Sequence, residues 1–408
     1  MSKVKRFYFI IACVLVVGAA AAPGQETASS NADTSAVDTV VVDTTAVVED
    51  VHPEELKESK FEVKVLGVVR VNAFYDLEGM EYSEGFRPID IPVGADDTER
   101  FQGLYLGARQ SRIGVESTAL TSLGPLKTYI EGDFVGPQGT FTFRLRHAYG
   151  QLKYWTLGQT WSTAMDLEAL PLTVDFEGPN SAVLIRQGLA RYQRRFGEPY
   201  IFGIGVENPT SDFTNPFDTL EVASRQSNFD VTSRIKYRRE RGHVQLSGIF
   251  RAIGYTVNSG DKQHAYGGGV VLSARGQTHR DGNILLQAIA GKGISRYING
   301  LSGAGLDGVI TPGGKLELFD AFGWYLAYQW NWSNSVLSSV VVGSTNVRSN
   351  VDMPPDFFRR GDYGTVDTFW EILPTVSFGF GVTIGRRVNN DGQKGNAERI
   401  GFIGRFSF

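Results

Sequence analysis

The 408-residue chain contains a single cysteine, Cys13, and five histidines. Cys13 lies in a segment that we expect to be removed on export. The mature protein is therefore predicted to have no thiol for a thiolate metal site, a nucleophile or a disulfide. None of the histidines shows the spacing of a metal-binding set, and the sequence has no glycine-rich loop of the kind that binds phosphate. We expect no metal and no cofactor.

Long apolar runs are also scarce. The only one is Phe7–Ala22, about 16 residues against the ~20 that a membrane-spanning helix needs. It follows three basic residues and precedes small ones, which is the pattern of a secretory signal peptide. We expect residues 1–24 to form this signal peptide, with cleavage after Ala21 or after Gly24. Any further membrane crossing has to be made by strands.

Aromatic residues are missing from 25–60, where nine acidic residues stand against two lysines. The low hydrophobicity and the net charge of −7 predict an acidic, low-complexity periplasmic extension. A short oligomerising coil is the alternative, although the valines of this segment keep no steady heptad. Beyond residue 60 the acidic and basic residues balance, so nucleic-acid binding has no support.

The body of the chain alternates in character from residue 61 onward. Successive residues of a strand face opposite sides of a sheet. Between 322 and 332 the even-numbered residues are nearly all aromatic, and between 229 and 238 apolar residues alternate with Arg234, Lys236 and Arg238. Alternation of this kind, with aromatic residues on the apolar face, is typical of a barrel that is apolar outside and polar inside.

The pattern predicts sixteen strands. Their approximate ranges are 62–78, 101–117, 124–135, 140–150, 153–161, 181–196, 199–208, 226–239, 242–254, 263–275, 282–293, 316–332, 335–347, 365–373, 375–387 and 397–408. Connections after odd-numbered strands are long, apart from 136–139, and those after even-numbered strands are short, as in outer-membrane barrels with external loops and periplasmic turns. Sixteen strands leave an aqueous lumen. We therefore expect an all-β fold: a 16-stranded antiparallel transmembrane β-barrel over 61–408 with an inward-folded constriction loop.

The last strand ends in alternating aromatic residues, with Phe406 and the terminal Phe408 on one parity. This ending is usual for bacterial outer-membrane proteins and is the signal that the barrel-assembly machinery reads. We therefore predict an outer-membrane location in contact with lipid. The N-terminal extension and the C-terminus are expected in the periplasm, because an even number of strands returns the chain to the side where it began.

Several long motifs carry a resemblance to a known family. They are RQSR (109–112), LGPLKTYIEGDF (123–134), FRLRHAYGQL (143–152), GQTWSTAMDLEALPLTVDFEGPN (158–180) and GRRVNNDGQKG (385–395). Together with the aromatic last strand, these stretches resemble the DcaP-like porin family. The resemblance implies a homotrimeric, sixteen-stranded porin that favours small anionic solutes, dicarboxylates in particular. Members of the family can also carry an N-terminal coiled-coil extension.

The loop 162–180 is the candidate constriction, because it follows the fifth strand on the external side, where general porins fold a loop inward. It carries the carboxylates Asp166, Glu168, Asp175 and Glu177. The wall expected to face it carries Arg109, Arg112, Arg144, Arg146, Arg186 and Arg191. Arginine suits an anion pore, since it stays charged and binds a carboxylate with two parallel hydrogen bonds.

Parity limits this list of arginines. Arg109 and Arg112 have opposite parity, and so have Arg186 and Arg191, so both members of a pair face the lumen only where a bulge or a strand end intervenes. We expect one residue of each pair rather than both. His147 shares the parity of outward-facing neighbours, which predicts an outward side chain.

Two other classes of function compete with the porin. An outer-membrane hydrolase needs a nucleophile, a base and an orienting group, and no serine motif accompanies His147. A structural or adhesion barrel predicts a plugged lumen with negligible conductance. We therefore expect a porin for passive diffusion of small hydrophilic solutes rather than an enzyme.

Overall fold

The computed structural model describes residues 61–78, 80, 84–94, 102–136, 141–258, 260–278 and 281–408. The predicted signal peptide (1–24) and acidic extension (25–60) lie outside these residues. The strands are β1 (Phe61–Glu78), β2 (Gly103–Gly107), β3 (Arg112–Thr121), β4 (Gly124–Val135), β5 (Phe141–Leu152), β6 (Trp155–Trp161), β7 (Arg186–Phe196), β8 (Tyr200–Glu207), β9 (Val222–Ser224), β10 (Asp230–Arg239), β11 (Gly242–Val257), β12 (Gln263–Gln277), β13 (Gly282–Lys292), β14 (Gly308–Ile310), β15 (Leu316–Leu318), β16 (Asp320–Ser333), β17 (Val336–Arg348), β18 (Phe358–Leu373), β19 (Val376–Asn389) and β20 (Lys394–Ser407).

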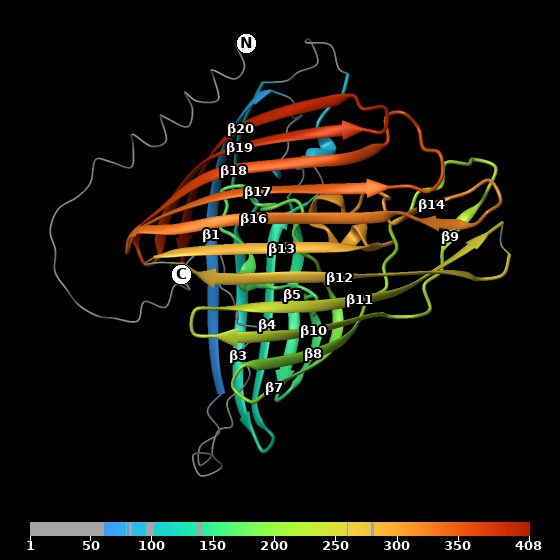
Figure 1. Cartoon of the computed structure of the whole chain (residues 1–408). Coiled ribbons are helices and arrows are strands. Elements are labelled where there is room, and N and C mark those ends of the chain that lie inside the picture. The colour runs from blue at the N-terminus through green and yellow to red at the C-terminus, as the bar shows by residue number, and fades with distance from the viewer. Residues whose placement is uncertain are drawn as a thin grey trace. The chain divides into compact units, whose positions relative to one another are not determined.

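Eighteen of these segments form one antiparallel sheet (Figure 1). Two strand positions are interrupted. β2 and β3 both pair with β1, and β9 and β10 both pair with β11, so each couple occupies one position in the barrel. The result is a closed barrel of sixteen strands, which confirms the predicted fold class.

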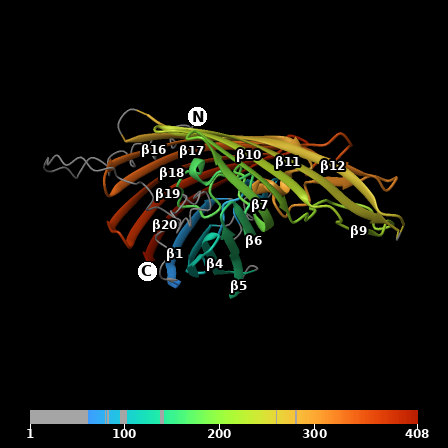
Figure 2. The same cartoon turned by 90° about the horizontal axis from the view of Figure 1, so that it is seen from below.

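The barrel closes where β20 pairs with β1, from Val68 opposite Ser407 to Glu78 opposite Glu398. The terminal residue extends this seam, because Gly67 and Phe408 exchange two backbone hydrogen bonds of 3.0 Å. Figure 2 shows β16 to β20, then β1 and β4, following one another around the ring. Closure pairs the two edge strands with each other. Unpaired backbone groups at such an edge would find no water to hydrogen-bond with in the interior of a membrane.

Burial alternates along the strands in the predicted way. In β16, Phe322 and Leu326 are 42% and 47% exposed, whereas Ala321 and Tyr325, which directly precede them, are 3% and 1% exposed. The exposed residues face outward and the buried ones face inward. The part of the chain that the structure describes has no helix with the length and apolar character to cross a membrane.

Three connections turn into the barrel and pack on its inner face; we name them by the order in which they occur. The first inner segment is residues 84–94, with the 3₁₀ turn η2 (Pro88–Asp90). The second is residues 162–185, with η4 (Leu167–Ala169). The third is residues 293–319, with η5 (Ser295–Tyr297), η6 (Asn299–Leu301) and the hairpin β14–β15.

Glycines on the inner wall make room for these segments. A Cβ atom built on Gly401 meets Val174 Cγ1 of the second segment at 2.8 Å, and one on Gly381 meets Val174 Cβ at 3.2 Å. On β12 and β13, a Cβ atom on Gly269 or Gly291 comes within 3.0 Å of Ile294 Cδ1 of the third segment. Close backbone approach therefore explains these strand glycines.

Strand limits differ from the predicted ones in several places. The second predicted strand is broken at residues 108–111, the sixth begins at Arg186 instead of near residue 181, and the fourteenth begins at Phe358 instead of near residue 365. In the predicted range 316–332, Leu316–Leu318 pairs with β14 in a separate hairpin and the barrel strand starts at Asp320. In the second, sixth and twelfth predicted strands a break or an inner segment replaces regular pairing, whereas in the fourteenth regular pairing extends further than predicted.

Candidate functional site

Four arginines gather on the inner side of the strands β3, β5 and β7. This cluster, called the arginine wall below, consists of Arg112, Arg144, Arg146 and Arg186. Arg186 lies within Coulombic range of the other three, and Arg112 acts in the same way on Arg146. The four side chains therefore share one field.

A β-bulge shapes this wall. Glu131 of β4 lies opposite His147 of β5, and Gly132 lies opposite Leu145, so Arg146 is an extra residue without a partner in the ladder. An extra residue reverses the parity of all that follows it. Arg144 and Arg146 face inward before the bulge, and His147 faces inward after it.

The prediction for His147 was therefore wrong. Its side chain is 7% exposed, its Nδ1 lies 3.1 Å from Thr160 Oγ1, and its ring centroid lies 5.4 Å from that of Trp161. The prediction assumed that residues alternate between outward and inward from Leu145 to His147, and the bulge at Arg146 interrupts that alternation.

Two carboxylates on β4 hold the arginines of β5. Arg144 donates to both oxygens of Asp133, at 2.9 and 2.7 Å, which is the bidentate geometry that arginine favours. Arg146 donates to Glu131 at 2.8 Å and to Asp133 at 2.7 Å. The Asp133 side chain has no exposed surface, whereas that of Arg144 is 41% exposed. These ion pairs orient the two guanidinium groups and leave part of Arg144 accessible.

Arg186 has a different environment. Its guanidinium carbon lies 4.5 Å from the centroid of the Trp161 ring. Among the described residues no carboxylate forms an ion pair with it, and its buried Nη1 has no hydrogen-bond partner. With four arginines and two carboxylates, the arginine wall carries an excess of positive charge.

The early part of the second inner segment, residues 166–168, contacts a different part of the barrel. Asp166 accepts hydrogen bonds from Lys236 Nζ at 2.9 Å and from Ser273 Oγ at 2.6 Å, and it lies 2.8 Å from His243 Nε2. Glu168 pairs with Lys236 at 2.8 Å and also with Arg238. Burial opposes ionisation, but the hydrogen bond from His243 and the charge of Lys236 hold the pKa of Asp166 below its usual range.

Asp166 and Glu168 therefore do not face the arginine wall as the sequence led us to expect. Their partners lie on β10, β11 and β12, and the contacts brace the segment.

The tip of the second segment, residues 173–177, contacts strands on several sides of the barrel. The Val174 carbonyl accepts a 2.8 Å hydrogen bond from Arg70 of β1, and its amide donates to Asp367 of β18 at 3.2 Å. The Phe176 ring has the guanidinium carbons of Arg70 and Arg146 at 5.5 and 5.8 Å. The tip therefore reaches from the β18–β1 side of the barrel to the arginine wall.

Asp175 is buried behind this tip. Its carboxylate accepts hydrogen bonds from the amides of Phe86 and Glu177, at 3.1 and 3.3 Å, and from the Tyr363 hydroxyl at 3.4 Å. Burial and the nearby Glu177 carboxylate raise its pKa to about 7. Asp175 thus anchors the tip to the first inner segment and to β18.

The remaining predicted residues are also buried. Arg109 lies in the break between β2 and β3 and donates to Glu84 of the first inner segment at 2.5 Å. The break lets both Arg109 and Arg112 be buried, each 8% exposed, despite their opposite parity. Arg191, on the inner face of β7, donates to the Trp161 carbonyl at 3.4 Å and is in Coulombic range of Arg234 and Glu207.

Three arginines that contact the second segment were not among the predicted site residues. They are Arg70, which holds the tip, Arg234, which donates to the Met165 carbonyl at 3.5 Å, and Arg238, which pairs with Glu168. Their polar parity was visible in the sequence, but the course of the second segment towards them was not.

The hydroxyl, imidazole and carboxylate around Asp166 do not form a catalytic relay. Ser273 and His243 both bond to the carboxylate, so the serine does not donate to the imidazole as a nucleophile does to its base. Within the described ranges, no three His, Cys, Asp or Glu residues are grouped in a way that could hold a metal ion.

Comparisons with known proteins agree with this architecture. The family model described as DcaP outer membrane protein matches residues 43–408. The crystal structure of the outer membrane channel DcaP of Acinetobacter baumannii is 19% identical, with 85% of this chain and 97% of that chain covered and a TM-score of 0.72. The anion-selective porin from Comamonas acidovorans is 11% identical, with 86% and 100% covered and a TM-score of 0.55. OmpT of Vibrio cholerae is 11% identical, with 86% and 99% covered and a TM-score of 0.55. No curated protein matches the sequence.

Proposed function

The chain belongs to the DcaP outer membrane protein family, and from this we propose that it is a porin whose passage for small hydrophilic solutes favours small anions such as dicarboxylates. The observation that carries the proposal is the excess of arginine over carboxylate on β3 to β7, opposite the tip of the second inner segment. In this proposal the tip is the constriction and the arginine wall is its charged side.

The physical argument is electrostatic. Two unit charges ~4 Å apart interact by ~4 kcal/mol at an effective dielectric of ~20, against ~1 kcal/mol in bulk water. Among the described residues no carboxylate pairs with Arg186, so its positive charge is not offset, and the side chain of Arg144 is 41% exposed and so within reach of a solute carboxylate. Nearby carboxylates such as Glu131 and Asp133 weaken the attraction, which lets the solute leave again.

The first test is the reversal potential of the purified protein in a planar bilayer under a salt gradient. We expect anion selectivity, conductance in steps of three, and a reduction of chloride current by an added small dicarboxylate. The steps test the proposed homotrimer. Cation selectivity would overturn the anion preference, and negligible conductance would favour the plugged structural barrel.

For orientation, we propose that the long connections face outward from the cell and that both termini are periplasmic. Residues 1–24 act as signal peptide and 25–60 as an acidic periplasmic extension in this proposal. The outward apolar band, which includes Phe322 and Leu326, meets the outer-membrane lipid.

We also propose that Phe406 and Phe408 are read by the barrel-assembly machinery. Both side chains are exposed on the finished barrel, at 42% and 63%, so the loss of either ring removes little buried surface. Replacing Phe408 with alanine is expected to lower the amount of folded barrel in cells severalfold while the purified, denatured variant still refolds in detergent. Heat-modifiable migration on a gel measures both quantities.

The matched control is Phe141→Ala, which removes a 78% exposed ring at the first residue of β5. This control should assemble like the wild type. Equal assembly of Phe408→Ala and wild type would contradict the proposed signal.

A further inference from the structure

Part of the inner face of β11 to β17 is apolar. The inward residues Ile249, Val271 and Ile289 on β11 to β13, and Ala321 and Val347 on β16 and β17, are all 5% exposed or less. The inner face of a water-filled barrel is normally polar. An apolar inner face therefore indicates a dry contact with protein rather than contact with the solute path.

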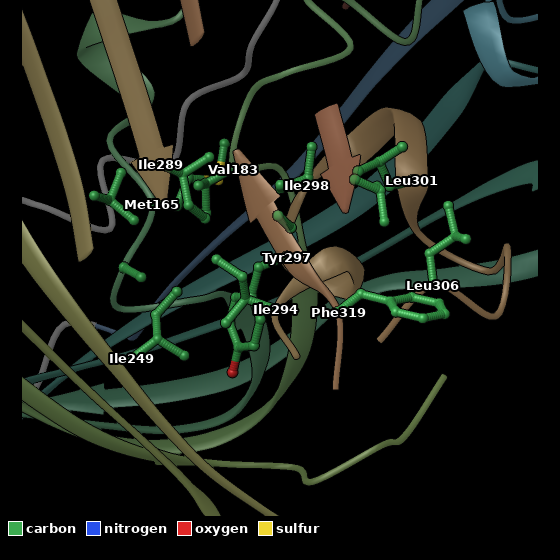
Figure 3. Close-up of a cluster of buried hydrophobic side chains, with 14 of the residues drawn as sticks. Met165, Val183, Ile249, Ile289, Ile294, Tyr297, Ile298, Leu301, Leu306 and Phe319 are labelled. Carbon is green, nitrogen blue, oxygen red and sulfur yellow. The ribbon is translucent and has the colours of Figure 1, made fainter. Parts of the chain in front are cut away.

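The third inner segment supplies that contact. Ile294, Tyr297 and Ile298 have 0% exposure, and Figure 3 shows them gathered beside Ile289 and Val183. The wall lacks Cβ atoms where Ile294 approaches most closely, as described for the glycines of β12 and β13. The segment and the wall are thus shaped for each other.

Buried ion pairs fix the same segment to β10 and β11. Arg251 of β11 donates to Asp307 of the segment at 2.7 Å and to Asp230 of β10 at 3.1 Å. Asp230 also accepts hydrogen bonds from Tyr297 at 2.9 Å and Arg296 at 3.2 Å. Removing one partner of a buried pair leaves an uncompensated charge, so such a network resists opening.

The third segment is also joined to the second. Val183 and Ile298 are partners in an antiparallel β-bridge. The amides of Asn299 and Gly300 donate to the carbonyls of Ala182 and Asn180, at 2.9 and 2.7 Å. Two connections that are more than 100 residues apart in sequence therefore pack as one layer over the apolar wall.

The inner face from β4 to β7 is polar. Its inward residues include Glu131, Asp133, Gln187 and Arg191, and the Arg144 side chain on this face is 41% exposed. We infer that the third inner segment is a fixed plug that seals the β11–β17 side of the lumen and holds the second segment in place. Solutes then pass only between the tip of the second segment and the inner faces of β3 to β7. The inference rests on the proposed function for its solute path.

The first experiment opens the plug. The double variant Ile298→Asp, Leu301→Asp places charges at positions with 0% and 1% exposure, and the control Pro312→Asp, Gly313→Asp places the same charges at the exposed end of the same segment. We expect the single-channel conductance in KCl to rise at least about twofold in the first variant, because a barrel of this size encloses a wide lumen once unfilled. The control should match the wild type. An unchanged conductance in a folded, heat-modifiable Ile298→Asp, Leu301→Asp barrel overturns the inference.

The second experiment avoids destabilising the barrel. Cysteines at the bridged positions, Val183→Cys and Ile298→Cys, should form a disulfide, since bridged residues of antiparallel strands have Cα atoms at a suitable separation. A fixed plug predicts equal conductance before and after oxidation. Loss of conductance on oxidation, absent from the single variant Val183→Cys, shows that the segment must move for solutes to pass and overturns the inference.

The proposed plug and the proposed anion preference can be disproved independently of each other. The plug determines the size of the conductance, whereas the arginine wall determines the sign of the reversal potential. A cation-selective channel whose conductance rises in Ile298→Asp, Leu301→Asp would remove the anion preference and leave the plug.

Discussion

Replacing Arg144 and Arg146 together with alanine is expected to abolish the anion preference of the channel. The wild-type wall has four arginines and two carboxylates, and the double variant has two of each. The permeability ratio of chloride to potassium should fall by about tenfold, which corresponds to ~1.4 kcal/mol in the partitioning of an ion. The loss of one or two positive charges ~8 Å from the solute path is sufficient for this change. One such charge contributes ~2 kcal/mol to the interaction with an anion at a dielectric of ~20.

Reversal potentials in a KCl gradient measure this change. The matched control is Arg360→Ala, Arg386→Ala, which removes two exposed arginines near the start of β18 and the end of β19. A second variant, Glu131→Gln and Asp133→Asn, removes the negative charges of the wall and should increase the anion preference. An unchanged ratio in the Arg144, Arg146 variant would refute a selective role for the wall.

The arginines of this wall differ in what they offer a solute. Arg144 and Arg146 are committed to Asp133 and Glu131, so their main contribution is charge. Arg186 rests on Trp161 and keeps part of its fork unoccupied by described carboxylates. Arg186 therefore adds positive charge that no described carboxylate offsets, and the 41% exposed side chain of Arg144 is the part of the wall that a solute carboxylate can contact.

The barrel could be predicted from sequence because it depends on a local, repeating property. Each strand must present an apolar face to lipid, so alternation persists from β1 to β20 and the turns punctuate it. The limits of the strands could not be predicted so well. At residues 108–111 the chain leaves the ladder where Arg109 meets Glu84, a contact that depends on the fold of the first inner segment.

The site was less predictable because parity and loop course are not local. The single extra residue at Arg146 turns His147 inward, and the run FRLRHAYGQL contains no glycine or proline near that point to mark a bulge. Asp166 finds Lys236 and Ser273, which are 70 and 107 residues away. Such partners follow only from the closed barrel.

The sequence contains an indication of the plug, but the pattern does not by itself say what covers the strand. The stretch 284–290, ILLQAIA, is apolar on both parities. Runs of this kind occur where both faces of a strand are buried. In a barrel with lipid on one side, they indicate that protein covers the other.

Asp175 should make the stability of the barrel depend on pH near neutrality. Burial and Glu177 raise its pKa from 3.8 to about 7 in the folded protein. The folded state therefore favours the protonated form. The stability contributed by that proton is fully present below the ordinary pKa of an aspartate and is lost as pH rises through about 7.

The groups around Asp175 give the effect its direction. The carboxylates of Glu177 and Asp367 disfavour its ionisation, and the charge of Arg399 opposes them. A shift of about three pKa units corresponds to at most ~4 kcal/mol in the free energy of unfolding. Asp166, whose pKa is lowered, stays ionised over this range and adds no such dependence.

The variant Asp175→Asn should therefore be more stable than the wild type at pH 8 and nearly equal to it at pH 5. Thermal unfolding in detergent, followed by heat-modifiable migration at both pH values, measures the difference. The control Asp391→Asn changes an exposed carboxylate in the β19–β20 turn and should follow the wild type. Parallel pH profiles for wild type and Asp175→Asn would mean that the buried carboxyl does not titrate near neutrality, and the tip of the second segment would then owe its position to Val174 and Phe176 alone.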